Sequence, residues 1–206
     1  MLRCRVSLAI LVALLIPAAG CVDGDSTSVF VLGNAQLDDD CAVQPDTLWV
    51  QGRMDTAIAR DYVLHLIVRN QILANSSAVG TDPSGVSFTR AEVQLFQDAA
   101  GTPVAGVEDA YSVPVSGFVP SAEDFETPGE NWVTVPAIPA TVRDSLRGRG
   151  RATVHLGVTL FGKTNGQIEV ETAQWLYLVD ICDGCLACVD DEERGTCNPG
   201  QENECY

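Results

Sequence analysis

The stretch YVLHLIVRN, residues 62–70, decides the fold class, because an apolar residue stands at every second position of it. A period of two is typical of a β-strand that buries one face. The stretch TVHLGVTLF, residues 153–161, repeats the pattern. Both stretches are therefore predicted to be half-buried strands. The residues expected to point into the core are Tyr62, Leu64, Leu66, Val68, Val154, Leu156, Val158 and Leu160.

Outward from these two stretches, weaker alternation predicts further strands, separated by clusters of Gly, Pro, Asn and Asp. One short helix is predicted over residues 141–147, after Pro139 and before Gly148. Several short strands without long helical segments between them favour an all-β chain. We expect an antiparallel β-sandwich that resembles immunoglobulin-like domains. The weaker strands are expected at residues 48–54, 87–97, 111–119 and 131–138.

The last strand is expected to be interrupted. The dipeptide Asn165-Gly166 predicts a hairpin turn that leads into it. Beyond the turn, Glu169 and Glu171 have the same parity as the apolar residues further along. A straight strand would place carboxylates and aromatic rings on one face. A bulge or bend is therefore expected near residues 172–174.

The first residues have the pattern of an export signal. Arg3 and Arg5 precede an apolar run that ends at Pro17. A short basic region followed by an apolar stretch and small residues is typical of a cleaved signal peptide. The run is shorter than the roughly 20 residues that a membrane-spanning helix needs. Residues 1–20 are therefore predicted to be a signal peptide.

The four residues AAGC that end at Cys21 resemble the lipobox of bacterial lipoproteins. This resemblance implies that the Cys21 thiol is acylated and that Cys21 becomes the mature N-terminus. It also implies a location in the bacterial cell envelope, and Val22 at the next position suggests the outer membrane. The alternative is an ordinary signal peptidase site, with Cys21 serving as one more disulfide cysteine.

The charge of the chain disfavours some classes of partner. The chain has 12 basic and 28 acidic residues, and loss of Arg3 and Arg5 leaves 10 against 28, a net charge of −18. Such a surface repels phosphate backbones and anionic headgroups. We therefore expect no nucleic-acid partner and attachment to the membrane through the lipid. About 185 residues remain after cleavage, which is enough for one domain.

The cysteines of the mature chain predict disulfides. Apart from Cys21 they form an even set of six, which in an exported chain is typical of disulfide bonding. Five of the six lie in the last 25 residues, so full oxidation within one chain requires Cys41 to pair with one of those five. The position of Cys182 and Cys185 at the end of the last strand favours one of them as its partner. The six are Cys41, Cys182, Cys185, Cys188, Cys197 and Cys205.

The spacing Cys182-x2-Cys185-x2-Cys188 also resembles the start of an iron–sulfur ligand run, and Cys-x2-Cys pairs occur in zinc and redox sites. The spacing onward to Cys197 and Cys205 fits neither a ferredoxin run nor a second Cys-x2-Cys pair. A thioredoxin-like redox motif would stand at the start of a helix in a βαβ unit, whereas this pair ends a predicted strand. Disulfides are therefore the favoured interpretation, and we expect no metal and no cofactor.

The composition divides the mature chain into three parts. Residues 21–45 are predicted to be a lipidated acidic tether, whose apolar patch at residues 29–32 is expected to add an edge strand. Residues 46–182 form the predicted sandwich and residues 183–206 a cysteine-rich tail. The acidic runs 38–40 and 190–193 offer clustered oxygens that suit calcium. Neither has the spacing of a calcium loop, so solvated charge is the favoured interpretation.

The segment Gly157-VTLFG-Lys163-Thr164 matches the phosphate-loop pattern of nucleotide-binding proteins. Such a loop needs flexible residues followed by a helix N-terminus. Here β-branched and aromatic residues fill the pattern, and a hairpin turn follows it. The segment is therefore predicted to be the end of a strand, and no nucleotide is expected.

Nothing in the sequence identifies a catalytic residue. The only histidines, His65 and His155, stand on the polar parity of strands and are expected to face solvent. The motifs of serine hydrolases and zinc peptidases are absent from the sequence. The favoured function is a lipid-anchored, extracytoplasmic binding module for a protein or polymer. The alternatives are a structural accessory lipoprotein of an envelope complex and, third, a hydrolase that uses surface carboxylates.

Overall fold

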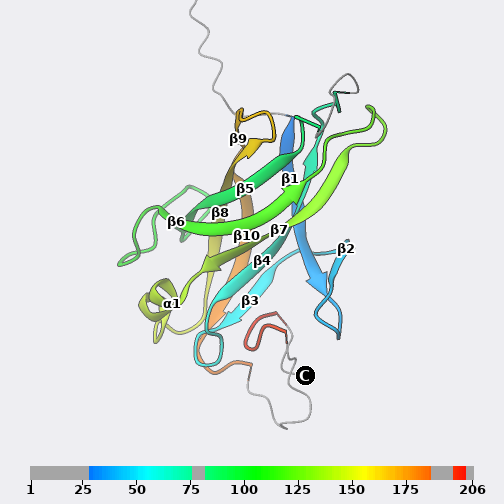
Figure 1. Ribbon diagram of the computed structural model, residues 1–206. Helices are drawn as coiled ribbons and strands as arrows, with labels where there is room; N and C mark the ends of the chain where they lie inside the picture. Colours follow the sequence, from blue (N-terminus) through cyan, green and yellow to red (C-terminus); the bar gives the residue numbers. More distant parts are fainter. Residues whose placement is uncertain (1–27, 76–81, 187–196, 203–206) are drawn as a thin grey trace, which may run out of the picture.

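The computed structural model of the protein describes residues 28–75, 82–186 and 197–202 (Figure 1). The predicted signal peptide, Cys21, the acidic run 190–193 and the cysteines Cys188 and Cys205 lie outside the described residues. Within them the chain forms ten strands and one helix. These are β1 (Val29–Leu37), β2 (Val43–Trp49), β3 (Gly52–Asp55), β4 (Tyr62–Asn70), β5 (Val86–Phe96), β6 (Tyr111–Val119), β7 (Gly129–Ile138), α1 (Ala140–Leu146), β8 (Ala152–Thr164), β9 (Glu169–Glu171) and β10 (Trp175–Cys182).

The strands form one curled sheet with the order β2-β1-β4-β7-β6-β5-β8-β10-β3, and β9 adds to β8. The neighbours are antiparallel except for β10 and β3, which run parallel. The expected all-β class with one short helix is confirmed. The sheet is mixed rather than purely antiparallel, and the immunoglobulin-like arrangement is not confirmed. Residue alternation reveals which face of a strand is buried but not which strand lies beside it, so the parallel pair escaped prediction.

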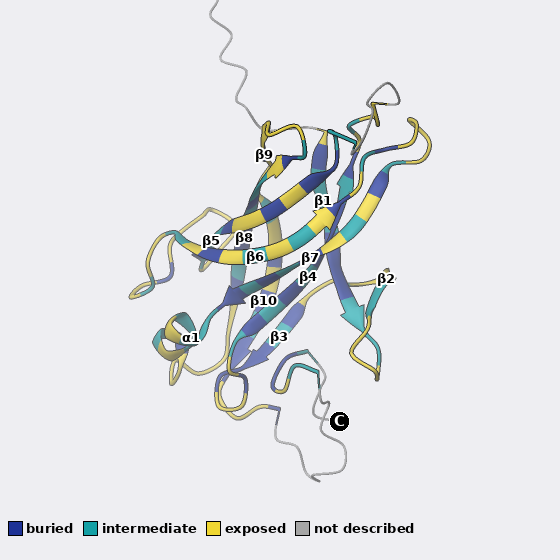
Figure 2. Cartoon of the chain, viewed as in Figure 1, coloured by how far each residue is buried: buried dark blue, intermediate teal, exposed yellow. Residues whose placement is uncertain are grey.

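The core lies inside the curl of the sheet. Figure 2 shows buried and exposed residues alternating along β5 and β6, as expected for strands with one inner and one outer face. All eight inward-pointing residues predicted for β4 and β8 are buried, none more than 4% exposed. Their burial removes apolar surface from water and supplies the main driving force of folding.

The strand boundaries correct two expectations. The segment expected at residues 48–54 is split between β2 and β3, because the chain bends at residues 50–51. The patch at residues 29–32 opens β1, which pairs with β2 on one side and with β4 on the other. Among the described residues, the patch pairs with β4 alone and only residues 34–37 of β1 also pair with β2, so the patch itself is an edge segment as expected. The sheet nevertheless begins within the segment expected to be a tether.

The other local features are as predicted. The helix spans Ala140–Leu146, within one residue of expectation, and Leu146 anchors it to the core. Residues 165–166 form the turn after β8. The last strand is interrupted where a bulge was expected, since β9 ends at Glu171 and β10 begins at Trp175. Within the described residues no helix has the length and apolar character needed to span a membrane.

Residues 197–202, here called the tail latch, lie beside β3 at the end of the molecule opposite β9 (Figure 1). The backbone N–H of Glu202 donates to the carbonyl of Arg53 at 2.8 Å. The N–H of Asp55 donates to the carbonyl of Gly200, also at 2.8 Å. The latch therefore covers the free edge of β3, which would otherwise expose unpaired backbone groups.

The same latch reaches across to β4. Buried Gln201 donates through Nε2 to the carbonyl of Asp61 at 2.7 Å, and its Oε1 accepts the N–H of Val63 at 3.0 Å. The hydroxyl of Tyr62 donates to the carboxylate of Glu202. Burial, and then the nearby Glu202 charge, raise the pKa of Tyr62 well above its usual value, so this hydroxyl keeps its proton. The tail latch thus joins β3, the last strand of the sheet, to β4, which is not its neighbour in the strand order. We call this junction the seam of the curled sheet.

Candidate functional site

Cross-strand register builds two rows of side chains on the outer face of β5, β8 and β9. In a sheet, directly paired residues point to the same side. Pairing places Arg90, Phe161 and Glu171 in the first row. The second row consists of Ser87, Lys163 and Glu169.

A bulge in β5 sets the position of Arg90. The register shifts between Phe88 and Arg90, so that Thr89 is the extra residue of the bulge. As a result Thr89 and Arg90 both face outward, while Phe88 packs into the core. Bulges of this kind redirect a side chain without ending a strand. Here the bulge brings the guanidinium of Arg90 over the neighbouring strand β8.

Arg90 is held against an aromatic ring. Its guanidinium carbon lies 3.7 Å from the centroid of the Phe161 ring, which is a cation–π contact. Within the described residues this guanidinium has one hydrogen bond, from Nη1 to the hydroxyl of Ser112 at 3.4 Å, and no ion pair. A guanidinium has five N–H donors in a planar fork. Arg90 is therefore oriented by the ring while most of its donors stay open to the surface.

The two rows line a hollow of about 480 Å³, called here the β5–β8–β9 hollow. Small-molecule sites usually have volumes of about 300–1,000 Å³. Gly162 lies between the rows, and a Cβ at this position would stand 2.3 Å from the carbonyl oxygen of Ser87. Only glycine therefore lets β8 approach β5 this closely. The hollow combines an aromatic ring, hydroxyl groups and charges of both signs.

Charges in the hollow balance, although the chain as a whole carries −16. Lys163, the only lysine of the chain, pairs with Glu169, with 3.5 Å between Nζ and Oε1. Arg90 and Glu171 have no ion-pair partner in the part of the chain that the structure describes. The hollow thus presents one open cation and one open anion beside a closed ion pair.

The phosphate-loop match falls within this region. Gly157–Thr164 belongs to β8, and its backbone pairs with β5 on one side and with β10 and β9 on the other. The prediction that this segment is a strand is confirmed. Its Lys163 does point into a hollow, but the hollow is formed by three strands and not by a loop before a helix.

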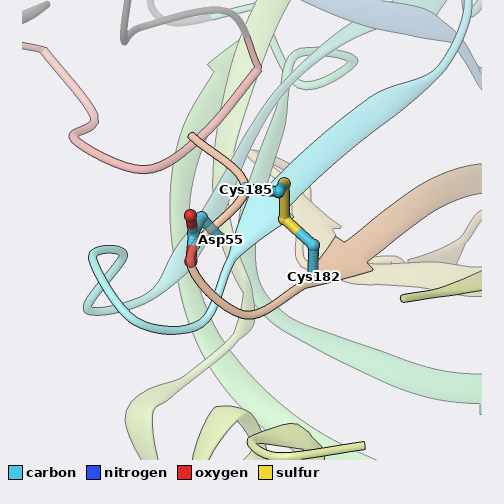
Figure 3. Close-up of side chains that lie close together, drawn as sticks. All are labelled: Asp55, Cys182 and Cys185. Atoms are coloured by element: carbon cyan, nitrogen blue, oxygen red, sulfur yellow. A yellow bond between two sulfur atoms is a disulfide. The ribbon is translucent and has the colours of Figure 1, made fainter. Parts of the chain in front are cut away.

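The Cys182-x2-Cys185 pair is a disulfide, with 5.9 Å between the two Cα atoms. Figure 3 shows Asp55 beside it, and the three side chains bring potential metal-binding atoms within 4.8 Å of one another. Sulfur atoms bonded to each other offer no thiolate to a metal. The cluster therefore has the chemistry of a structural crosslink.

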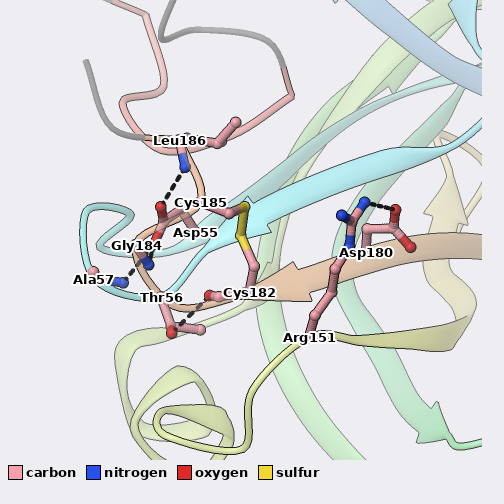
Figure 4. Close-up of a disulfide and its surroundings, with 9 residues drawn as sticks. All are labelled: Asp55, Thr56, Ala57, Arg151, Asp180, Cys182, Gly184, Cys185 and Leu186. Carbon is pink, nitrogen blue, oxygen red and sulfur yellow. Dashed lines mark hydrogen bonds and ion pairs between the residues drawn. A yellow bond between two sulfur atoms is a disulfide. The ribbon is translucent and has the colours of Figure 1, made fainter. Parts of the chain in front are cut away.

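The carboxylate of Asp55 is engaged by the backbone. Its two oxygens accept the N–H groups of Ala57, Gly184 and Leu186 at 2.7–2.9 Å (Figure 4). The hydroxyl of Thr56 donates to the carbonyl of Cys182 at 2.9 Å. The end of β3 therefore holds the loop that follows β10, and the buried Asp55 side chain replaces the water that these N–H groups would otherwise bind.

Cys41 pairs with a tail cysteine, as expected if all six cysteines are oxidised within one chain, but its partner is Cys197 and not Cys182 or Cys185. The preference for the end of β10 is wrong because Cys182 and Cys185 bond to each other. The carboxylate of Asp38 shapes the turn before Cys41 by accepting the N–H groups of Asp40 and Ala42. The acidic run 38–40 therefore has a structural role in presenting Cys41 to the tail latch.

The two histidines do not form a common site. His65 is half-buried rather than solvent-facing, because Trp49 and Gln201 line the same small hollow beside it. Its Nδ1 lies 3.3 Å from the hydroxyl of Thr134, and its Nε2 is buried without a hydrogen-bond partner among the described residues. Burial lowers the pKa of His65 below its usual 6.5. His155 lies on the outer face of β8, where its register partners are Phe96 and Leu178.

Arg90 and the row that it forms with Phe161 and Glu171 were not predicted from the sequence. The alternation of β8 placed Phe161 and Lys163 on its polar side, but the strand that would face them was unknown. The one signal for β5 was the loss of alternation at Thr89-Arg90, where two polar residues stand together.

None of three comparisons, with protein-family models, with curated proteins and with solved structures, produced a match to this chain.

Proposed function

We propose that this chain is a lipid-anchored, extracytoplasmic binding module and that its ligand docks in the β5–β8–β9 hollow. The observation that carries this proposal is the arginine in that hollow. Arg90 is fixed on an aromatic ring with most of its donors unused. A guanidinium oriented in this way binds a ligand without first losing side-chain freedom.

The proposed location rests on the chemistry of the cysteines. Two disulfides bond four of the cysteines within the described residues. Disulfides persist in compartments outside the bacterial cytoplasm. The lipobox-like AAGC sequence supports acylation of Cys21 and attachment to the envelope, with the outer membrane as the proposed address. The strongly acidic surface favours attachment through a lipid over attachment through basic side chains.

The binding half of the proposal is tested by mapping amide chemical shifts of the mature, lipid-anchored protein in detergent micelles. The probes are dialanine, a neutral disaccharide, and small mono- and dicarboxylic acids. We expect at least one probe class to shift the amides of residues 87–90, 161–163 and 169–171 in a saturable way. If no probe shifts these amides at millimolar concentration, the hollow is not a ligand site.

A matched pair of variants locates the binding. Arg90→Gln keeps a polar side chain at the site but removes its charge, and should weaken binding of a ligand that contacts the guanidinium. Arg60→Gln removes the same charge from a side chain that is 90% exposed on a loop between β3 and β4. Equal weakening by both variants would indicate a general charge effect and not a site at the hollow.

A further inference from the structure

We propose that the β5–β8–β9 hollow recognises a zwitterion, namely a free amino acid or a short peptide, with the carboxylate on Arg90 and the ammonium group on Glu171. This inference rests on the proposed binding function and names its ligand class. It follows from the position of the two open charges and from the closed ion pair beside them.

The two open charges are arranged in one row. Arg90 is paired with Phe161 across β5 and β8, and Phe161 is paired with Glu171 across β8 and β9. Neighbouring strands are about 4.8 Å apart, so the backbones that carry the two charges are about 10 Å apart. The guanidinium leans over the Phe161 ring on the middle strand. This leaves roughly one strand spacing between the positive and the negative pole.

That spacing suits a ligand of one or two residues. An extended chain covers about 3.3–3.6 Å per residue, so the charged ends are about 3.5 Å apart in a free amino acid and about 7 Å apart in a dipeptide, and these two lengths bracket one strand spacing. The carboxylate would take two N–H donors of Arg90 in a bidentate contact, which is the geometry that a planar guanidinium offers. The ammonium group would lie at Glu171, which is exposed and has no ion-pair partner among the described residues.

The second row repeats the polarity of the first. Lys163 stands on β8 and Glu169 on β9, so that in both rows the carboxylate is on β9 and the cation lies on the β5 side of it. The electric field across the hollow therefore has one direction. A ligand with two opposite charges can align with this field, whereas an anion that reaches Arg90 also approaches the two carboxylates. A ligand of zero net charge also avoids the repulsion that a chain of −16 exerts on anions.

The test compares four forms of one probe on the mature protein in micelles. Dialanine has both charges, N-acetyl-dialanine lacks the cation, dialanine amide lacks the anion, and N-acetyl-dialanine amide lacks both. We expect dialanine to bind in the hollow and each single block to weaken binding by about tenfold or more, the usual effect of losing one charge-assisted contact. These comparisons use the unmodified protein, so they do not depend on the folding of any variant.

Two variants then assign the charges. Arg90→Gln should abolish the preference for dialanine over its amide and keep the preference for a free amine. Glu171→Gln should abolish the preference for a free amine and keep the preference for dialanine over its amide. Arg60→Gln should change neither preference. Equal binding of all four forms, or preferences that survive both variants, would overturn the zwitterion proposal.

The failures of the two proposals are distinguishable. If dialanine does not bind but a disaccharide or a simple carboxylic acid shifts the amides of the hollow, the zwitterion proposal is wrong and the binding function stands. If no probe of any class shifts those amides, both are wrong.

Discussion

Removal of the Cys41–Cys197 disulfide should cost a large part of the stability of the protein. The bond joins residues 156 positions apart and ties the turn after β1 to the tail latch. In the chain-entropy model, freeing a loop of this length gives the unfolded chain about 5 kcal/mol of additional conformational entropy, and losses of native disulfides generally fall between about 2 and 5 kcal/mol. We therefore expect the variant Cys41→Ala/Cys197→Ala to lose about 3–5 kcal/mol.

The assay is equilibrium unfolding in urea, followed by tryptophan fluorescence. The variant Cys182→Ala/Cys185→Ala is the comparison, because that bond spans a separation of only 3. The logarithmic dependence on loop length predicts an entropic effect smaller by about 3 kcal/mol for the short bridge. A loss below about 1 kcal/mol for the long bridge would refute the assignment of the tail latch as the clamp across the seam.

Four further predictions follow from contacts described above. Gln201→Ala should cost about 2–3 kcal/mol in urea unfolding, because it leaves the N–H of Val63 and the carbonyl of Asp61 without their partner. Asp55→Asn should cost about 2 kcal/mol, since an amide N–H₂ would face a backbone N–H, whereas exposed Asp183→Asn should stay within about 0.5 kcal/mol. The pKa of the His65 imidazole, measured by NMR, should lie below 6.5. As the pH drops through 6.5 the unfolded chain binds a proton at this residue before the folded chain does, so the free energy of unfolding should fall. The variant His65→Gln should lack this part of the pH dependence. Lys163→Ala should change stability by less than about 0.5 kcal/mol, because the side chain is 55% exposed, and a larger loss would contradict its place on the outer face.

The residues that alternation placed in the core are those that the structure buries. Alternation is a local property, and the inner positions of β4 and β8 could be read directly from it. The interruption before Trp175 could also be predicted, because a change of parity within one strand requires an extra residue.

What depends on contacts between distant segments could not be predicted. The partner of Cys41 was decided by the turn at Asp38 and by the return of the tail latch to β3. The parallel pairing of β3 with β10 and the row that joins Arg90 to Glu171 both depend on the order of the strands in the sheet. Strand order leaves no trace in the periodicity of a single strand.

Export with a lipid on Cys21 is the proposal on which attachment to the cell envelope depends. The most direct measurement of it is the intact mass of the native protein extracted from membranes, compared with that of the variant Cys21→Ala. We expect a chain that begins at Cys21 and carries the mass of fatty acyl groups, and a variant that lacks this added mass and no longer partitions into detergent. A native chain that retains residues 1–20, or that begins at residue 21 without added mass, would contradict the account.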